Sequence, residues 1–267
     1  MADKTARNGV ILIGTGAAAV AGYFLWKFLQ GGAAAQTPST PASTEAATKN
    51  INKDTEKKTS MTHILHLDSS PRGSSSHSRM VSGELVEALK AANPGVTVTY
   101  RDLGHQEIPY VNETFIGAMY TPVEARSAEQ NEALALSMEL IAELKAADTY
   151  VFGIPMYNFT VPGVFKSYID LIVRPGVTFD PATYTGLLPN KKVVFVTARG
   201  GGGYGPGEAH EAYNVQDPVL KNVFGLMGVA DMEFIHVNNT LGGEDVVNGA
   251  LAEARKKIAS LAPTLTK

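Results

Sequence analysis

The chain has 267 residues, of which 44% are hydrophobic and 18% charged, an ordinary composition for a globular protein. Its formal net charge of -3 gives no reason to expect nucleic-acid binding. Cysteine is absent from the sequence, which excludes disulfide bonds, thiolate metal sites and a cysteine nucleophile. The six histidines are scattered without the spacing of a metal site, so no metal is expected.

The first 30 residues contain a long apolar run. Residues 9–26 have no charged side chain, and residues 9–29 contain a single lysine. A membrane-spanning helix needs about 20 apolar residues. We therefore expect residues 1–30 to form a hydrophobic helix that anchors the chain in a membrane. A cleaved signal peptide is the alternative, and the lysine near the end of the run counts against it.

Residues 31–60 are expected to be a disordered linker. They are rich in alanine, threonine, serine, proline and lysine and contain one isolated isoleucine. Such a segment buries too little apolar surface to offset the entropy of ordering it. The remaining residues, 61–267, carry 16 basic and 22 acidic side chains and are expected to form the folded domain.

From His63 onward, short β-type runs alternate with helical patterns. Five apolar runs predict strands over residues 63–67, 96–100, 149–155, 191–198 and 232–237. Apolar residues at helical spacing predict helices over residues 78–92, 127–147, 164–173, 218–227 and 244–261. This alternation predicts an α/β domain, a parallel sheet with helices on both faces. Two doubly wound topologies, flavodoxin-like and Rossmann, fit the pattern equally at this point.

The loop after the first strand, Asp68–Ser78, contains six serines among its eleven residues. It precedes a helix, whose N-terminus offers unpaired N–H groups and the positive end of the helix dipole to an anion. The loop lacks both G-x-x-x-x-G-K-[ST] and G-x-G-x-x-G, which counts against an ATPase and a dinucleotide site here. A serine-rich loop without lysine suits a phosphate monoester such as that of FMN. The alternative is an N-cap with additional serines.

Two further loops follow the third and fourth strands, where doubly wound proteins bind ligands. Residues 155–160 contain two aromatic side chains and Asn158, which suit a flat heteroaromatic ligand; the alternative is that the rings only fill the helix–sheet junction. Residues 197–207 contain six glycines, which let a backbone approach a ligand closely. A G-x-G-x-x-G match within them follows the wrong strand for a dinucleotide fingerprint.

Together, these loops resemble those of the FMN-dependent NADH-azoreductase family, a branch of the flavodoxin-like NAD(P)H:quinone reductases. The resemblance covers residues 61 to about 267. It rests on Ser69-Ser70 with Ser76-His77-Ser78, on Pro155–Phe159, on Tyr168–Leu171 continuing to Arg174–Phe179, on Arg199-Gly200-Gly201 and on the helical stretch Glu132–Lys145. It implies a flavodoxin-like doubly wound sheet of five parallel strands in the order 2-1-3-4-5.

The resemblance also implies a set of FMN-binding residues. The phosphate is expected at Ser70, Ser76, His77 and Ser78. The isoalloxazine is expected against Met156, Tyr157, Asn158 and Phe159, with its pyrimidine end at Ala198, Arg199, Gly200 and Gly201. The substrate site is expected to be walled by Phe115, Tyr120, Phe159 and Phe179. Two residues depart from the family pattern: Ala198 stands where a serine is usual, and His77 where a glutamine is expected.

A family member of this kind is a homodimer with its active site at the subunit interface. The resemblance implies hydride transfer from NADH or NADPH to FMN and then to quinones or azo compounds, in a two-electron ping-pong reaction without a catalytic side chain. The alternative is a flavodoxin-type electron carrier without its own substrate. The apolar run predicts a membrane-anchored protein, and the need for NADH or NADPH favours a reductase domain that faces the cytoplasm. A soluble cytoplasmic protein, or export with residues 1–35 as a signal, are alternatives.

Overall fold

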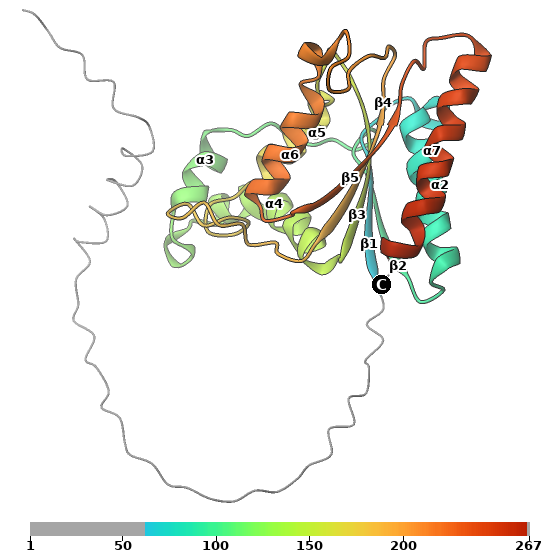
Figure 1. Cartoon of the computed structure of the whole chain (residues 1–267). Coiled ribbons are helices and arrows are strands. Elements are labelled where there is room, and N and C mark those ends of the chain that lie inside the picture. The colour runs from blue at the N-terminus through green and yellow to red at the C-terminus, as the bar shows by residue number, and fades with distance from the viewer. Residues whose placement is uncertain (1–61, 266–267) are drawn as a thin grey trace, which may run out of the picture. The chain divides into compact units, whose positions relative to one another are not determined.

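Five parallel strands form one sheet at the centre of residues 62–265, the part of the chain that the computed structural model describes (Figure 1). The strands are β1 (His63–Asp68), β2 (Thr97–Asp102), β3 (Thr149–Pro155), β4 (Lys192–Ala198) and β5 (Asp231–Val237). Their order, β2-β1-β3-β4-β5, confirms the prediction of a flavodoxin-like doubly wound sheet and excludes the Rossmann order.

The predictions for the N-terminal region need a correction. The hydrophobic helix expected within residues 1–30 and the linker expected over residues 31–60 lie outside the described residues. Among residues 62–265, no helix is long and apolar enough to cross a bilayer. The prediction of a membrane-anchored reductase is therefore wrong for the part of the chain that the structure describes.

Helices cover both faces of the sheet (Figure 1). One face packs against α2 (His77–Ala92) and α7 (Glu244–Leu265), whose buried residues form one apolar cluster with the strands. The other face packs against α4 (Ala128–Ala146), α5 (Gly163–Ile172) and α6 (Gln216–Leu226), and α3 (Glu113–Tyr120) packs on α4, away from the sheet (Figure 1). Short 3₁₀ turns η1 (Gly73–Ser75), η2 (Val123–Ala125) and η3 (Glu211–Tyr213) lie in the connections.

Side-chain caps mark where several helices begin. Ser127 and Gln130 form a capping box at the start of α4, in which each side chain accepts a hydrogen bond from the other residue's backbone N–H. Asn112 caps α3 by accepting from the N–H of Phe115. The sequence patterns did not predict α3 because it has only eight residues. Ser76 caps α2, which places the start of that helix at the carboxyl edge of the sheet.

The central strand β3 is buried along its whole length, TYVFGIP. A central parallel strand is covered on both faces, which explains the continuous apolar run in the sequence. Phe152 on this strand packs edge-on against Phe224 of α6 with ring centroids 5.6 Å apart, and Phe195 of β4 lies 5.2 Å from the same ring. Burying each phenylalanine contributes about 1.5–3 kcal/mol to folding. This aromatic cluster fixes α6 against β3 and β4.

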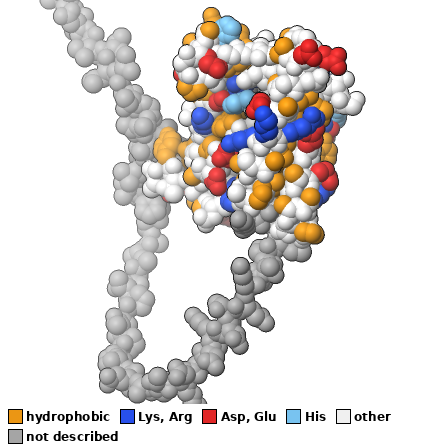
Figure 2. Space-filling view, turned by 45° about the vertical axis from the view of Figure 1, so that its right-hand side comes forward, with side chains coloured by type: hydrophobic (Ala, Val, Ile, Leu, Met, Phe, Trp, Pro, Cys, Tyr) orange, Lys and Arg blue, Asp and Glu red, His pale blue; other side chains and the backbone are white. Residues whose placement is uncertain are grey.

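The surface over α2 and α7 mixes charges of both signs. Figure 2 brings this side forward and shows lysine and arginine side chains beside aspartates and glutamates, with hydrophobic side chains scattered between them. Arg255 of α7 donates to both carboxylate oxygens of Glu84 on α2, at 2.9 and 2.7 Å. Exposed ion pairs of this kind contribute little to stability. The two helices are held mainly by the apolar cluster beneath them.

Candidate functional site

A cavity of about 210 Å³ opens at the carboxyl edge of the sheet. The loops that follow β1, β3, β4 and β5 meet there because all strands of a parallel sheet end at the same edge. Its lining residues are Ser70, Arg72, Ser76, His77, Pro155, Met156, Tyr157, Ala198, Gly200, Thr240 and Leu241. The three loops that were predicted to form a site are therefore brought together in one cavity.

The loop after β1 wraps the N-terminus of α2. Ser76 is the N-cap, and its Oγ accepts a hydrogen bond of 3.4 Å from the backbone N of Arg79 and lies 3.1 Å from the Oγ of Ser78. Ser70 is fully buried, and its Oγ accepts from the backbone N of Arg72 at 3.3 Å. The first N–H groups of an α-helix have no partner within the helix. Those of His77 and Ser78 are the first two of α2, so the loop presents backbone donors to the cavity.

The side chain of Arg79, on the first turn of α2, stabilises the loop after β1. Its Nε donates to the carbonyl oxygen of Ser70 at 2.7 Å, and its guanidinium forms a two-point ion pair with Asp102 at the end of β2. Burial alone would raise the pKa of Asp102, but hydrogen bonds from Arg79 and His105 outweigh burial and lower that pKa to about 2. Asp102 is therefore ionised at neutral pH, and the pair ties the loop to the edge strand.

A second set of buried polar groups lies between β1 and α2. The carboxylate of Asp68 is 2% exposed and accepts a 2.8 Å hydrogen bond from the hydroxyl of Ser82. Tyr100 donates to the same carboxylate at 3.2 Å. Gly153 on β3 makes room for this arrangement, since a Cβ there would lie 2.1 Å from Oδ1 of Asp68. The absence of a side chain at this position lets β3 approach the start of α2.

The loop after β3 is a tight hairpin with a strained tip. Tyr157 and Thr160 exchange two backbone hydrogen bonds of 3.0 and 3.1 Å. The two residues between them, Asn158 and Phe159, have φ angles of 49° and 70°. Positive φ at both central positions is the type I′ geometry, which is unusual for a bulky residue such as phenylalanine and often marks a functional loop.

This turn separates the four residues predicted to contact a flat ligand. Met156 and Tyr157 line the cavity. Asn158 and Phe159 lie at the exposed tip, outside the cavity lining, and the ring of Phe159 stacks on Tyr213 with centroids 5.1 Å apart. The hairpin therefore presents one pair of side chains to the cavity and the other to its surroundings.

The loop after β4 presents alternate residues to opposite sides. Ala198 and Gly200 line the cavity, whereas Arg199 between them points away from it. The Arg199 side chain is 2% exposed and donates to Gln216 at 3.2 Å and to Asp217 at 2.5 Å. Burial lowers the pKa of Arg199 from its ordinary value, and the Asp217 carboxylate opposes this shift. The backbone N of Arg199 donates to the carbonyl oxygen of Val237 at 2.9 Å, so both the side chain and the N–H of Arg199 are bonded within the protein.

The loop after β5 completes the cavity, and sequence reasoning missed it. Thr240 donates from its backbone N and from its Oγ1 to the carbonyl oxygen of Arg199, at 3.0 and 3.1 Å, and Leu241 N donates to Gly200 at 3.2 Å. Both Thr240 and Leu241 line the cavity. The position of this loop at the carboxyl edge, next to β4, was the available signal. Gly201 lies beside the hydroxyl of Tyr204, outside the cavity lining.

The residues predicted to wall a substrate site are dispersed. Phe115 is 4% exposed and belongs to the core, where the guanidinium of Arg174 lies 5.4 Å from its ring centre. Tyr120 is exposed at the end of α3, and Phe179 packs beside Tyr184 with centroids 6.2 Å apart. None of the three lines the 210 Å³ cavity. The burial of Phe115 gives it a structural role in this chain.

The charges around the cavity favour an anionic ligand. Among the described residues that line it, there is no carboxylate, and Arg72 and His77 are the ionisable side chains beside the helix N-terminus. A larger cavity of about 500 Å³ lies beyond Arg199 and is lined by three carboxylates, those of Glu208, Glu211 and Asp217, and by two cations, Lys221 and the Arg199 side chain that is paired with Asp217. Carboxylates repel a phosphate, so the smaller cavity is the better phosphate site.

Comparisons with known proteins agree with this geometry. The flavodoxin-like fold family matches residues 62–262. An FMN-dependent NADH:quinone oxidoreductase of Nostoc punctiforme is 48% identical over 200 residues, covering 74% of this chain and 97% of that relative. One from Frankia casuarinae is 44% identical over 193 residues, covering 72% of this chain and 90% of that relative.

A solved structure of an azoreductase from Bacillus anthracis is also similar to this chain. It is 26% identical, with a TM-score of 0.68 over 76% of this chain and 99% of that one. The chain therefore belongs to the flavodoxin-like fold family and, within it, to the FMN-dependent NADH:quinone oxidoreductases.

Proposed function

We propose that the chain is an FMN-dependent oxidoreductase that oxidises NADH or NADPH and reduces quinones and aromatic azo compounds. The observation that carries this proposal is the cavity in which a helix N-terminus, the hairpin after β3 and the strand end Ala198–Gly200 converge. The activities for which the relatives are named, NADH:quinone oxidoreductase and azoreductase, support the same substrate classes.

The residues present fit FMN. A phosphate monoester needs hydrogen-bond donors and surroundings without negative charge. The loop after β1 supplies the hydroxyls of Ser70 and Ser76, the start of α2 supplies backbone N–H groups, and no carboxylate lines the cavity. A flat ring needs apolar walls and close backbone approach, and Met156, Tyr157 and Gly200 supply these.

In this proposal, the cofactor residues divide by loop. Ser70, Ser76, His77 and Ser78 hold the phosphate, with Ser78 acting through its backbone because its hydroxyl bonds to Ser76. Met156 and Tyr157 contact the ring, and Asn158 and Phe159 shape its exposed side. Ala198 and Gly200 meet the pyrimidine end, with Gly201 next to them in the chain, whereas Arg199 supports this loop from behind the cavity.

Bound FMN supplies two-electron redox chemistry, receiving hydride from NADH or NADPH in one half-reaction and reducing the quinone or azo acceptor in the next, a ping-pong scheme. The protein's part is to bind, orient and shield. The backbone N–H of Gly200, which lines the cavity, would donate to the pyrimidine end of a bound ring, because glycine leaves that N–H accessible. No side chain of this chain is needed as an acid or a nucleophile.

We also propose that the active unit is a homodimer. The cavity of about 210 Å³ is smaller than the roughly 300–1,000 Å³ that encloses a ligand of this size, so one chain leaves much of FMN uncovered. Hydrophobic side chains are exposed near its rim: Phe159 is 45% exposed, Tyr213 54% and Leu241 84%. A second copy that covers these residues would complete the site and exclude water from it.

The test is spectroscopic and kinetic. The purified protein loaded with FMN should show a flavin absorbance spectrum and should oxidise NADH in steady state with menadione and, separately, with an aromatic azo dye. Parallel lines in double-reciprocal plots would identify the ping-pong scheme. A flavin-loaded protein that NADH reduces without turnover on either acceptor would support an electron carrier and would refute the enzymatic proposal.

A further inference from the structure

A chain of buried hydrogen bonds lies behind the candidate site, on the side of Arg199 that faces away from the cavity. It begins at Arg199, whose Nε donates to Oε1 of Gln216 at 3.2 Å. The amide nitrogen of Gln216 in turn donates to the carbonyl oxygens of Ile154 and Pro155, both at 3.2 Å. Gln216 is 0% exposed and is the first residue of α6. One side chain thus spans the loop after β4 and the loop after β3.

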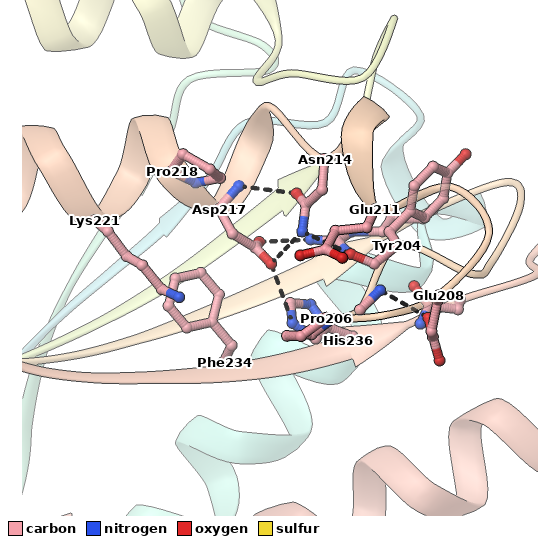
Figure 3. Close-up of a pocket in the computed structure, with 13 residues that line it drawn as sticks. Tyr204, Pro206, Glu208, Glu211, Asn214, Asp217, Pro218, Lys221, Phe234 and His236 are labelled. Atoms are coloured by element: carbon pink, nitrogen blue, oxygen red, sulfur yellow. Dashed lines mark hydrogen bonds and ion pairs between the residues drawn. The ribbon is translucent and has the colours of Figure 1, made fainter.

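The Arg199 end of this chain is anchored by Asp217. Figure 3 shows the Asp217 carboxylate between Asn214 and His236 in the 500 Å³ cavity, with an interaction to each. Asn214 donates to Oδ2 of Asp217 at 2.9 Å, and Nε2 of His236 lies 3.5 Å from the same oxygen. Burial, with the nearby Arg199 charge, lowers the pKa of His236 to about 4, so its ring is neutral at pH 7. The Arg199–Asp217 ion pair therefore has no competing cation at His236.

The amide of Gln216 is placed where it affects the cavity walls directly. Pro155 and the next residue, Met156, line the cavity on one side, and Ala198 and Gly200 line it on the other. The backbone N of Met156 donates to the carbonyl oxygen of Ala198 at 2.8 Å, so the two walls are joined by a hydrogen bond where β3 and β4 end. Beyond that contact, each wall is attached to Gln216, one through the carbonyl of Pro155 and one through the guanidinium of Arg199.

We propose that Gln216 is a positioning residue that sets the spacing and orientation of the two loops that hold the flavin ring. This inference rests on the proposed function, because it concerns the same site. Gln216 makes no hydrogen bond in this chain to the loop after β1, which is proposed to hold the phosphate, so we expect its effect to be confined to the ring end of the ligand. Only a side chain with both a donor and an acceptor at its tip can make both contacts, which explains the need for glutamine.

The inference is tested by measuring binding of FMN and riboflavin, which lacks the phosphate, to the apoprotein by fluorescence titration. In Gln216→Met, both ligands should bind about tenfold more weakly and by the same factor, because the loss falls on the ring walls. Ser76→Ala with Ser78→Ala should weaken FMN and leave riboflavin unchanged. Lys221→Met, which changes another residue of the 500 Å³ cavity, should leave both affinities unchanged.

Gln216→Glu separates the two ends of the chain. Glutamate keeps an acceptor for Arg199 but replaces the donor to Ile154 and Pro155, so binding of both flavins should weaken as in Gln216→Met. Wild-type affinity in Gln216→Glu or in Gln216→Met would overturn the inference. Should Gln216→Met fail to fold, Gln216→Asn, one methylene shorter, decides the same question with the same expected loss. A wild-type protein that binds neither flavin would instead refute the proposed function.

Discussion

Gly153→Ala should destabilise the folded domain strongly, although it adds a single methyl group. The new Cβ would lie 2.1 Å from Oδ1 of Asp68, 2.9 Å from Oγ of Ser82 and 3.2 Å from the carbonyl oxygen of Ser78. The Asp68 carboxylate is buried and bonded to Ser82, so it has no free space into which to move. The methyl group must therefore displace the carboxylate, the start of α2, or both.

The cost has two parts. Overpacking a well-packed interior costs about 1–3 kcal/mol, and loss of a buried hydrogen bond to a charged group costs about 1.5–3 kcal/mol. We expect a combined loss of about 3–5 kcal/mol in the free energy of unfolding. For a domain of this size, each kcal/mol shifts the melting temperature by about 2–4 °C, which gives a decrease of about 6–20 °C.

The assay is thermal unfolding followed by circular dichroism, with Gly249→Ala as the matched control. Gly249 lies within α7, and a Cβ there would meet nothing within 4 Å. Because alanine is the better helix former by up to about 1 kcal/mol, this control should be as stable as the parent or more so. A Gly153→Ala protein that melts within about 2 °C of the parent would have lost no more than about 1 kcal/mol, which would refute the tight packing inferred at Asp68.

Three further predictions concern the loop after β1. Replacing both Ser76 and Ser78 by alanine should weaken FMN retention on gel filtration and cost about 1 kcal/mol of stability through loss of the N-cap, while circular dichroism shows the fold retained. Arg79→Met should lower the free energy of urea unfolding by about 2 kcal/mol, because Asp102 loses its charged partner; Arg79→Lys should recover part of this, and equal losses would argue against the ion pair. Asp102 has a folded pKa of about 2 against an ordinary 3.8, so its carboxylate contributes stability above about pH 4 that is lost as the pH falls toward 2. The melting temperature of Asp102→Asn should therefore depend less on pH between about 4 and 2 than that of the parent protein.

The five strands were largely predictable from sequence because hydrophobic periodicity is a local signal, whereas the strand order came from the family resemblance, since the alternation of elements fits two topologies. Strand β3 reads as a continuous apolar run because it is buried on both faces. The end of β2 was less predictable. Its polar residues Arg101 and Asp102 extend the strand beyond the apolar run that predicted it, and they are held there by partners distant in sequence, Glu143 and Arg79.

The candidate site was predictable by loop but not by side chain. The motifs identified which loops meet, and Ser70, Ser76, Met156 and Ala198 do line one cavity. The Arg199 side chain points away from the cavity because successive residues of a strand face opposite sides. It is held there by Gln216, which lies 17 residues further along the chain. Which face a residue presents at a strand end, and which distant polar group receives it, is a property of the tertiary structure.

The alternation at Ala198, Arg199 and Gly200 has a consequence for how this site can change through evolution. The two adjacent residues at this strand end have different contacts. Arg199 donates to the buried carboxylate of Asp217, whereas Ala198 lines the candidate ligand cavity. In the proposed flavin site, a substitution at position 198 would change the cavity wall and leave the hydrogen bonds of Arg199 to Gln216 and Asp217 in place. Ala198→Ser, for example, would add a hydroxyl donor on the cavity side alone. Ala198 is itself 9% exposed, so only a small side chain fits at this position, and the cavity wall can change there while the Arg199–Asp217 ion pair is kept.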